Sequence, residues 1–61
     1  MTGQKIKHHR TIKGLSQSDL AMIVGVKQEH ISRWERGLHT PLLCNLHKIA
    51  EALNVNISEL V

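Results

Sequence analysis

Residues 15–37 read LSQSDLAMIVGVKQEHISRWERG, and this stretch decides the fold. Ser16 has the chemistry of a helix N-cap, because its hydroxyl can accept from the free N–H groups of a first turn, where Asp19 adds a carboxylate. The sequence therefore predicts a helix over about 17–24, ended by Gly25 in the left-handed conformation. The apolar face of this helix consists of Leu20, Ala21 and Val24.

A second helix is predicted over about 28–36, and Gly37 closes it. Ile31 and Trp34, three residues apart, lie on its inner face. The outer face is polar and basic, and carries Gln28, Glu29, Ser32, Arg33 and Arg36. Two short helices joined by a turn of three or four residues that contains glycine are typical of the DNA-binding helix-turn-helix.

The flanking residues add a family resemblance. The residues that carry it are GLSQ at 14–17, LA at 20–21, GV at 25–26, the pattern IS.WE.G at 31–37, Pro41, and L.KIA.AL at 46–53. From about Ile6 to Leu60 the chain is similar to the Cro and phage-repressor class of helix-turn-helix proteins, the XRE-like family. The resemblance implies a five-helix domain that binds duplex DNA, usually as a dimer, to control transcription.

Helix signals outside the central stretch agree with that number of helices. Thr40 is expected to cap the fourth helix, with Pro41 at the first helical position, and Asn54 is expected to stop it. Asn56 resembles the cap of a last short helix. The expected core stripe of the fourth helix is Leu42, Leu46, Ile49, Ala50 and Leu53. The predicted fold is therefore all-α, a compact lambda-repressor-like single domain over residues 1–61, with helices at about 4–13, 17–24, 28–36, 41–53 and 57–61.

Positive charge is concentrated near the N-terminus. Residues 1–14 hold four lysines and arginines and no acid, whereas residues 38–61 hold one lysine and two glutamates. This asymmetry suits contact with a polyanion through one face of the domain. The longest apolar run is too short to span a membrane, and the N-terminus lacks the apolar segment of a signal peptide, so a cytoplasmic location is expected.

Enzymatic and metal-binding functions find little support. Cys44 and His47 are three apart on one predicted helix, but a structural zinc site needs four ligands, and neither CxxC nor HxxxH occurs. No phosphate-binding glycine loop or catalytic triad pattern is present. Trp34, the only aromatic residue of the Phe, Tyr and Trp type, is interpreted as core rather than as a platform for single-stranded bases. We expect no enzyme activity, cofactor or metal.

The outer face of the second predicted helix in the central stretch is expected to read bases. Gln28 matches adenine and Arg33 matches guanine, each through two hydrogen bonds. Glu29 could accept from cytosine N4, but it could also pair with Arg33 four residues on, or repel wrong sites. Ser32 and His30 are further candidate contacts.

Four residues are candidate phosphate contacts. Gln17 begins its helix, whose N-terminal N–H groups attract an anion, and in the XRE-like family the matching glutamine contacts the DNA backbone. Lys27 occupies a position where relatives more often carry a capping Ser or Thr, and it is interpreted either as a phosphate contact or as a simple surface charge. Arg36 and Lys48 complete the set.

The same resemblance implies an ion pair between Arg10 and Glu35 that ties the first helix to the third. His9 lies where the family pattern has a leucine, and we interpret it as a histidine at the edge of the core that holds one hydrogen bond. Both interpretations concern packing rather than DNA contact.

A dimer contact is expected from apolar residues at the edge of the core stripe, namely Leu43, Leu60 and Val61. The alternative to a dimer contact is that these three residues are partly buried within one copy of the protein. The main hypothesis is a sequence-specific regulator of transcription, most simply a homodimeric repressor on a palindromic duplex site. The alternative is an antitoxin or antirepressor whose target is another protein and which binds DNA for its own regulation.

Overall fold

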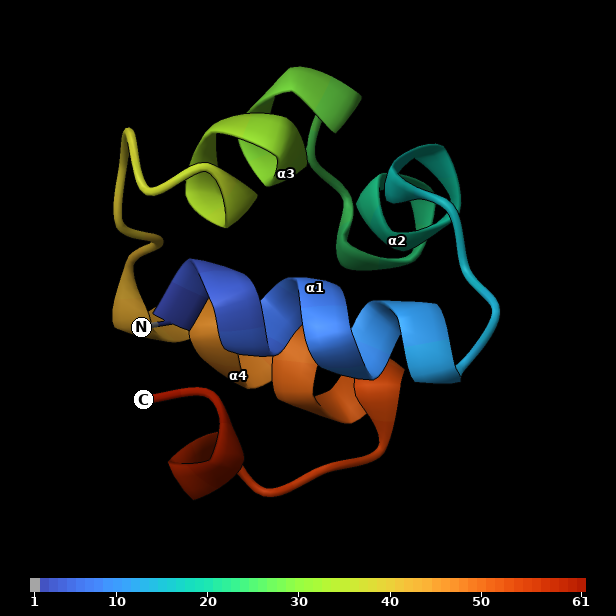
Figure 1. Ribbon diagram of the computed structural model, residues 1–61, viewed down its shortest axis with the longest axis vertical. Coiled ribbons are helices and arrows are strands. Elements are labelled where there is room, and N and C mark those ends of the chain that lie inside the picture. The colour runs from blue at the N-terminus through green and yellow to red at the C-terminus, as the bar shows by residue number, and fades with distance from the viewer. Residues whose placement is uncertain (1) are drawn as a thin grey trace.

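The computed structural model describes residues 2–61, which form four α-helices and one turn of 3-10 helix and contain no strand (Figure 1). The elements in chain order are α1 (Thr2–Ile12), α2 (Gln17–Val24), α3 (Gln28–Glu35), α4 (Leu43–Leu53) and the 3-10 helix Ile57–Glu59. Helices α1 and α4 pack together, and α2 and α3 lie across the same side of this pair (Figure 1). The all-α fold expected from the sequence is confirmed.

One apolar core joins all the elements. Trp34 and Ile31 enter it from α3, and Ile6 enters it from α1. The other buried apolar residues are Leu20, Ala21, Val24, Leu46, Ile49, Ala50, Leu53 and Leu60. Burial of a large apolar side chain contributes about 1.5–3 kcal/mol, so this core fixes the angle between α2 and α3.

Single residues stop and start the central helices as predicted. Ser16 and Asp19 form a capping box, in which the Asp19 N–H donates to the Ser16 hydroxyl and the Ser16 N–H donates to the Asp19 carboxylate, both at 3.0 Å. Gly25 ends α2 with a φ of 86°, and Asn54 ends α4 with a φ of 56°. These left-handed positions favour glycine and asparagine for steric reasons.

The expected start of the fourth helix is wrong. Helix α4 begins at Leu43, and Leu42 is its N-cap residue in an extended conformation, without a side-chain cap. Pro41 is buried ahead of the helix instead of opening it, and Thr40 is exposed. Because Leu42 lies outside the helix, its side chain is 70% exposed and does not extend the core stripe.

The chain ends also differ from the prediction. Helix α1 runs from Thr2 to Ile12, slightly earlier than expected, and the last helix is only a 3-10 turn. That turn is closed by the N–H of Leu60, which donates to the carbonyl of Ile57 at 2.9 Å. The tight turn directs Leu60 into the core, where it is 0% exposed. Leu60 is therefore wrong as a dimer contact.

Gly3 is a packing residue that no sequence pattern indicated. It is buried, and a Cβ atom at this position would collide with the carbonyl oxygen of Trp34 and lie 2.9 Å from that of Glu35. The absence of a side chain therefore lets the first turn of α1 approach the last carbonyls of α3. Gly3 fixes the distance between the two helices.

Candidate nucleic-acid interface

The exposed sides of α2 and α3 form a shallow depression of about 610 Å³. Its lining consists of Gln17, Lys27, Gln28, Glu29, Ser32, Arg33 and Arg36. The structure thus brings seven of the predicted DNA-contact residues to one surface, which we call the α2–α3 depression. Lys48 is exposed on α4 and does not line it.

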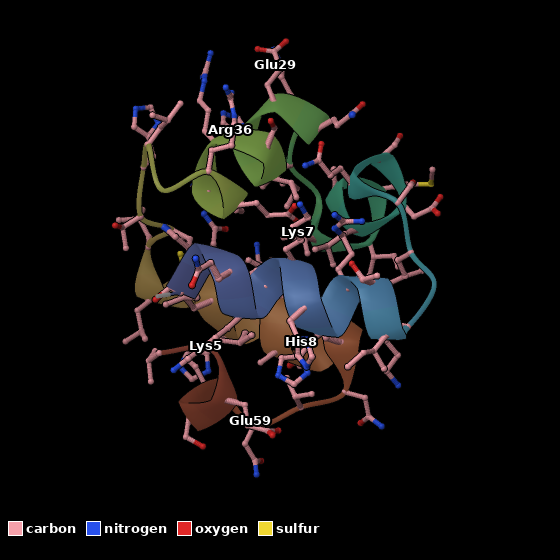
Figure 2. The ribbon with its side chains drawn as sticks, viewed as in Figure 1. Lys5, Lys7, His8, Glu29, Arg36 and Glu59 are labelled. Atoms are coloured by element: carbon pink, nitrogen blue, oxygen red, sulfur yellow. The ribbon has the colours of Figure 1, made fainter. Side chains whose placement is uncertain are left out.

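Helix α3 presents its polar face on the side of the molecule opposite its buried Ile31 and Trp34. Gln28 and Glu29 are exposed at its N-terminal end, and Glu29 projects away from α1 (Figure 2). Arg33 follows one turn later and is half-buried. A short helix with one apolar face in the core and the other open is suited to entry into the major groove of DNA.

Glu29 and Arg33 form the i, i+4 pair that the sequence allowed. The guanidinium Nη2 of Arg33 lies 3.7 Å from the carboxylate Oε2 of Glu29, and the two side chains are 43% and 76% exposed. An exposed pair of this kind stabilises a helix by about 0.3–0.5 kcal/mol. Either side chain can therefore leave the other at little cost to meet a base edge.

His30 takes over part of the capping that Lys27 cannot supply. Lys27 is the N-cap residue of α3 and makes no side-chain cap bond. Instead its backbone N–H donates to Nδ1 of His30 at 3.3 Å, and the His30 ring stacks on Trp34 with centroids 6.2 Å apart. The sequence offered one unused signal for this bond, a polar residue three positions after the N-cap.

Glu35 lies at the junction of three helices. The structure contains its pair with Arg10, in which Nε and Nη2 of Arg10 donate to the two carboxylate oxygens at 2.7 and 3.0 Å. The Arg10 Nη1 donates to the Leu15 carbonyl at 2.8 Å. The hydrogen bond to Glu35 raises the pKa of Arg10 above its ordinary value, so the guanidinium stays charged.

Gln17 also joins this cluster, and the sequence did not indicate it. Its Nε2 donates to Oε1 of Glu35 at 3.1 Å. The two residues are 18 apart, so their contact depends on how α2 and α3 pack, which no local pattern encodes. Gln17 therefore belongs both to the α2–α3 depression and to the cluster beneath it.

The remaining candidate residues lie outside the depression. His9 is half-buried, and its ring meets that of His8 edge-on at 5.1 Å. Cys44 and His47 are both exposed on α4, and no group of three or more potential metal ligands occurs within residues 2–61. Over the same residues, none of the helices has the length and hydropathy to cross a membrane.

Two of the three proposed dimer residues are exposed. Leu43 is 63% exposed at the start of α4, and Val61 is 59% exposed after the 3-10 turn. Leu42, at 70% exposed, adds a third apolar residue beside Leu43. The start of α4 thus presents two consecutive exposed apolar residues.

The family described as Helix-turn-helix matches residues 6–60 of this chain. The HTH-type transcriptional regulator SinR of Bacillus subtilis (strain 168) is 40% identical over 62 residues, a match that covers 100% of this chain and 56% of SinR. The chain therefore spans little more than half of the length of that relative.

Solved structures agree with this match. The structure of SinR in complex with DNA has a TM-score of 0.93 at 41% identity and covers 98% of this chain and 97% of that one. A SinR–SinI complex has a TM-score of 0.93 at 40% identity and covers 100% of this chain and 60% of that one. The P22 c2 repressor in complex with a synthetic operator has a TM-score of 0.95 at 31% identity, and the match covers 100% of this chain and 92% of that one. These similarities confirm the phage-repressor-like fold.

Proposed function

Since the chain belongs to the helix-turn-helix family, in its XRE/Cro-like class, we propose that it binds duplex DNA in a sequence-specific manner and regulates transcription, most simply as a repressor. The observation that supports this most strongly is the α2–α3 depression, which gathers side chains suited to bases and to phosphates on one exposed surface. The proposal is of a single DNA-binding domain rather than an enzyme, acting on the chromosome and therefore in the cytoplasm.

In the proposed complex, α3 lies in the major groove. Gln28 and Arg33 read adenine and guanine edges, and Ser32 lies beside them. Glu29 either accepts from cytosine or rejects wrong sites by repulsion. Each good two-bond contact with a base is worth about 1–3 kcal/mol of discrimination, so these few residues supply most of the specificity of one copy.

Phosphate contacts flank the groove. Gln17 lies at the N-terminus of α2, Lys27 precedes α3, and both line the α2–α3 depression. Arg36 follows α3 at its other end. Lys48 remains a weaker candidate, because it does not line the depression. Contacts of this kind hold the protein on the duplex and carry no direct information about sequence.

Dimer formation is part of the proposal. One short helix reads few base pairs, whereas two copies related by a two-fold axis read half-sites about 34 Å apart. Leu43 and Val61 are the residues that we assign to the contact, and the exposed Leu42 extends this surface. The proposal places these three residues in one contact, which we call the Leu42–Leu43–Val61 surface.

The direct test is selection of bound sites from random duplexes. We expect enrichment of a palindromic sequence that contains guanine at a fixed position in each half, together with loss of that guanine preference in Arg33→Ala. Recovery of unchanged random sequence at low and moderate salt would contradict the proposed function.

A protein partner is a second proposal, supported by the SinR–SinI complex among the similar structures. In this version the chain is an antitoxin or antirepressor, and DNA binding serves its own regulation. The genes beside its own separate the two proposals: an adjacent reading frame of toxin size favours the second, and a divergent promoter favours the first.

A further inference from the structure

Glu35 carries more contacts than are needed to hold α1 against α3. Its side chain is only 3% exposed, and its carboxylate accepts from Arg10 of α1 and from Gln17 of α2. The two hydrogen bonds from Arg10 would join α1 to α3 by themselves. The third, from Gln17, adds a residue that also lines the α2–α3 depression.

The hydrogen bond from Gln17 fixes the direction of its amide. A glutamine side chain loses much rotamer freedom when it is held in one place, and at an exposed helix start it would ordinarily turn freely. With one N–H of Nε2 donated to Glu35, the second N–H of the amide is left for another acceptor. One donor of Gln17 is thus held in place before any ligand arrives.

The backbone beside this donor is also suited to an anion. The first N–H groups of a helix have no partner within the helix. The capping box satisfies those of Ser16 and Asp19. Those of Gln17 and Ser18 lie between them, at the open end of α2, where the helix dipole favours negative charge. The free amide donor of Gln17 belongs to the same turn.

The charge of Glu35 would oppose this role if it were unpaired. A buried carboxylate close to the depression would repel a phosphate. Arg10 lies 2.7 Å from it and cancels that charge, so the carboxylate can orient Gln17 without driving the anion away. The ion pair therefore contributes both the acceptor and its neutralisation.

We propose that Glu35, neutralised by Arg10, is a positioning residue for the DNA-backbone contact of Gln17, and that the cluster of the three residues forms one phosphate-binding unit. This inference rests on the proposed function and concerns how its backbone contact is prepared. It assigns to the Arg10–Glu35 pair a role in affinity for DNA of any sequence, in addition to its role in packing.

A double-mutant cycle tests this. Arg10→Met together with Glu35→Met removes one positive and one negative charge, so the net charge stays the same, and replacement of a buried ion pair by apolar residues is often well tolerated. In the natural background, Gln17→Ala should weaken binding to selected and random duplexes alike by about 10-fold, as expected for a hydrogen bond to a charged group. In the Met/Met background the same change should cost less than about 2-fold, because the amide is no longer held.

The outcomes distinguish a failure of the proposed DNA-binding function from a failure of the positioning role of Glu35. If the natural chain binds no duplex, the proposed function fails, and this inference fails with it. If the natural chain binds but Gln17→Ala costs the same in both backgrounds, Glu35 merely packs, and only this inference is overturned. Thermal melting of all four proteins shows whether each is folded at the temperature of the binding assay.

A second measurement does not depend on the folding of the variants. In the natural protein, NMR of the side-chain amides compares Gln17 with Gln4 and Gln28, which are exposed. The Gln17 amide should be the most rigid of the three before DNA is added. The NMR resonance of one of its two amide protons should then shift when duplex is added. A Gln17 amide as mobile as that of Gln28 would overturn the inference.

Discussion

Arg33 and Lys27 line the same depression, but they are predicted to make different kinds of contact. Arg33 carries a planar guanidinium on the open face of α3, where it can meet a base edge, and Glu29 holds it only weakly at 3.7 Å. Arg33→Ala should therefore cost about 1–3 kcal/mol on the preferred site and very little on random duplex. Titrations against the selected site, its single-base variants and random DNA check this. A loss that is uniform across sequences would mean that Arg33 does not read bases.

Lys27 is the matched comparison for Arg33. Its flexible ammonium at the start of α3 suits a phosphate, since its side chain makes no cap bond. Lys27→Ala should weaken binding to every sequence equally and make the slope of log K against log salt shallower by about one unit. Binding measured across a series of salt concentrations gives that slope. An unchanged slope would favour the alternative in which Lys27 is only a surface charge.

The stability that the capping box contributes should depend on pH through the carboxylate of Asp19. Hydrogen bonds from the backbone and side chain of Ser16 lower the pKa of Asp19 below its ordinary value. A lowered pKa means that the ionised form stabilises the fold above the ordinary carboxylate range, and that this contribution is lost as the pH falls through the folded-state pKa. Asp19→Asn should therefore lower the melting temperature at neutral pH, and the difference should narrow in acid. A difference in melting temperature that stays constant from neutral to acid pH would contradict the role of the ionised Asp19 in the capping box.

At the scale of the helices, Gly3 controls how closely α1 approaches α3. A Cβ atom there would collide with the carbonyl of Trp34, and such overpacking typically costs about 1–3 kcal/mol. Gly3→Ala should therefore destabilise the fold, even though alanine is the better helix former. Denaturant unfolding measures the change, with Gln4→Ala, at the exposed neighbouring position, as the control. Equal stability of the two variants would show that α1 can shift without loss.

The ends of the helices differ in how well they could be predicted from the sequence. Helix ends at Ser16, Gly25 and Asn54 were predicted correctly because one residue carries the chemistry of each end. The start of α4 was not, since Pro41 is buried ahead of the helix instead of opening it, and burial depends on the tertiary fold. Leu60 was misassigned for a similar reason: the direction of a side chain after a tight turn depends on where the core lies.

The residues of the candidate site also divide into those that a local pattern predicts and those whose contacts depend on the packing of the helices. Helical periodicity was enough to group Gln28, Glu29 and Arg33 on one open face, because Glu29 and Arg33, four positions apart, share a side of the helix and Gln28 directly precedes Glu29. The bond between Gln17 and Glu35 was beyond such reasoning, since it joins two helices whose crossing is set by the core.

For the whole molecule, binding to duplex DNA should depend steeply on salt. The chain has a formal net charge of +3, and its phosphate-contact candidates lie mainly around one depression. Each phosphate neutralised should contribute about −0.9 to the slope of log K against log salt. Titration of one duplex at low and moderate salt measures the total slope. An affinity that stays flat over this range would contradict a contact with the DNA backbone.

Assembly is the other property of the whole molecule that can be tested. Leu43→Gln, on the Leu42–Leu43–Val61 surface, should weaken binding to a palindromic site by about 5-fold, as expected for an interface residue worth about 1 kcal/mol, and should leave binding to one half-site unchanged. Met22→Gln is the matched control, because Met22 is 76% exposed on α2 and outside this surface. Sedimentation of the DNA complexes counts the copies. One copy per palindrome in the natural protein would reject the dimer.

The stacking of His30 on Trp34 also makes the protein its own spectroscopic reporter. The chain has one tryptophan, no tyrosine and no phenylalanine, so its near-ultraviolet emission comes from a single indole. That indole is 7% exposed on the inner side of α3 and lies against the ring that helps to cap this helix. Any event that moves α3 or turns the His30 ring should therefore alter the colour or intensity of the emitted light, and unlabelled protein is sufficient to record it.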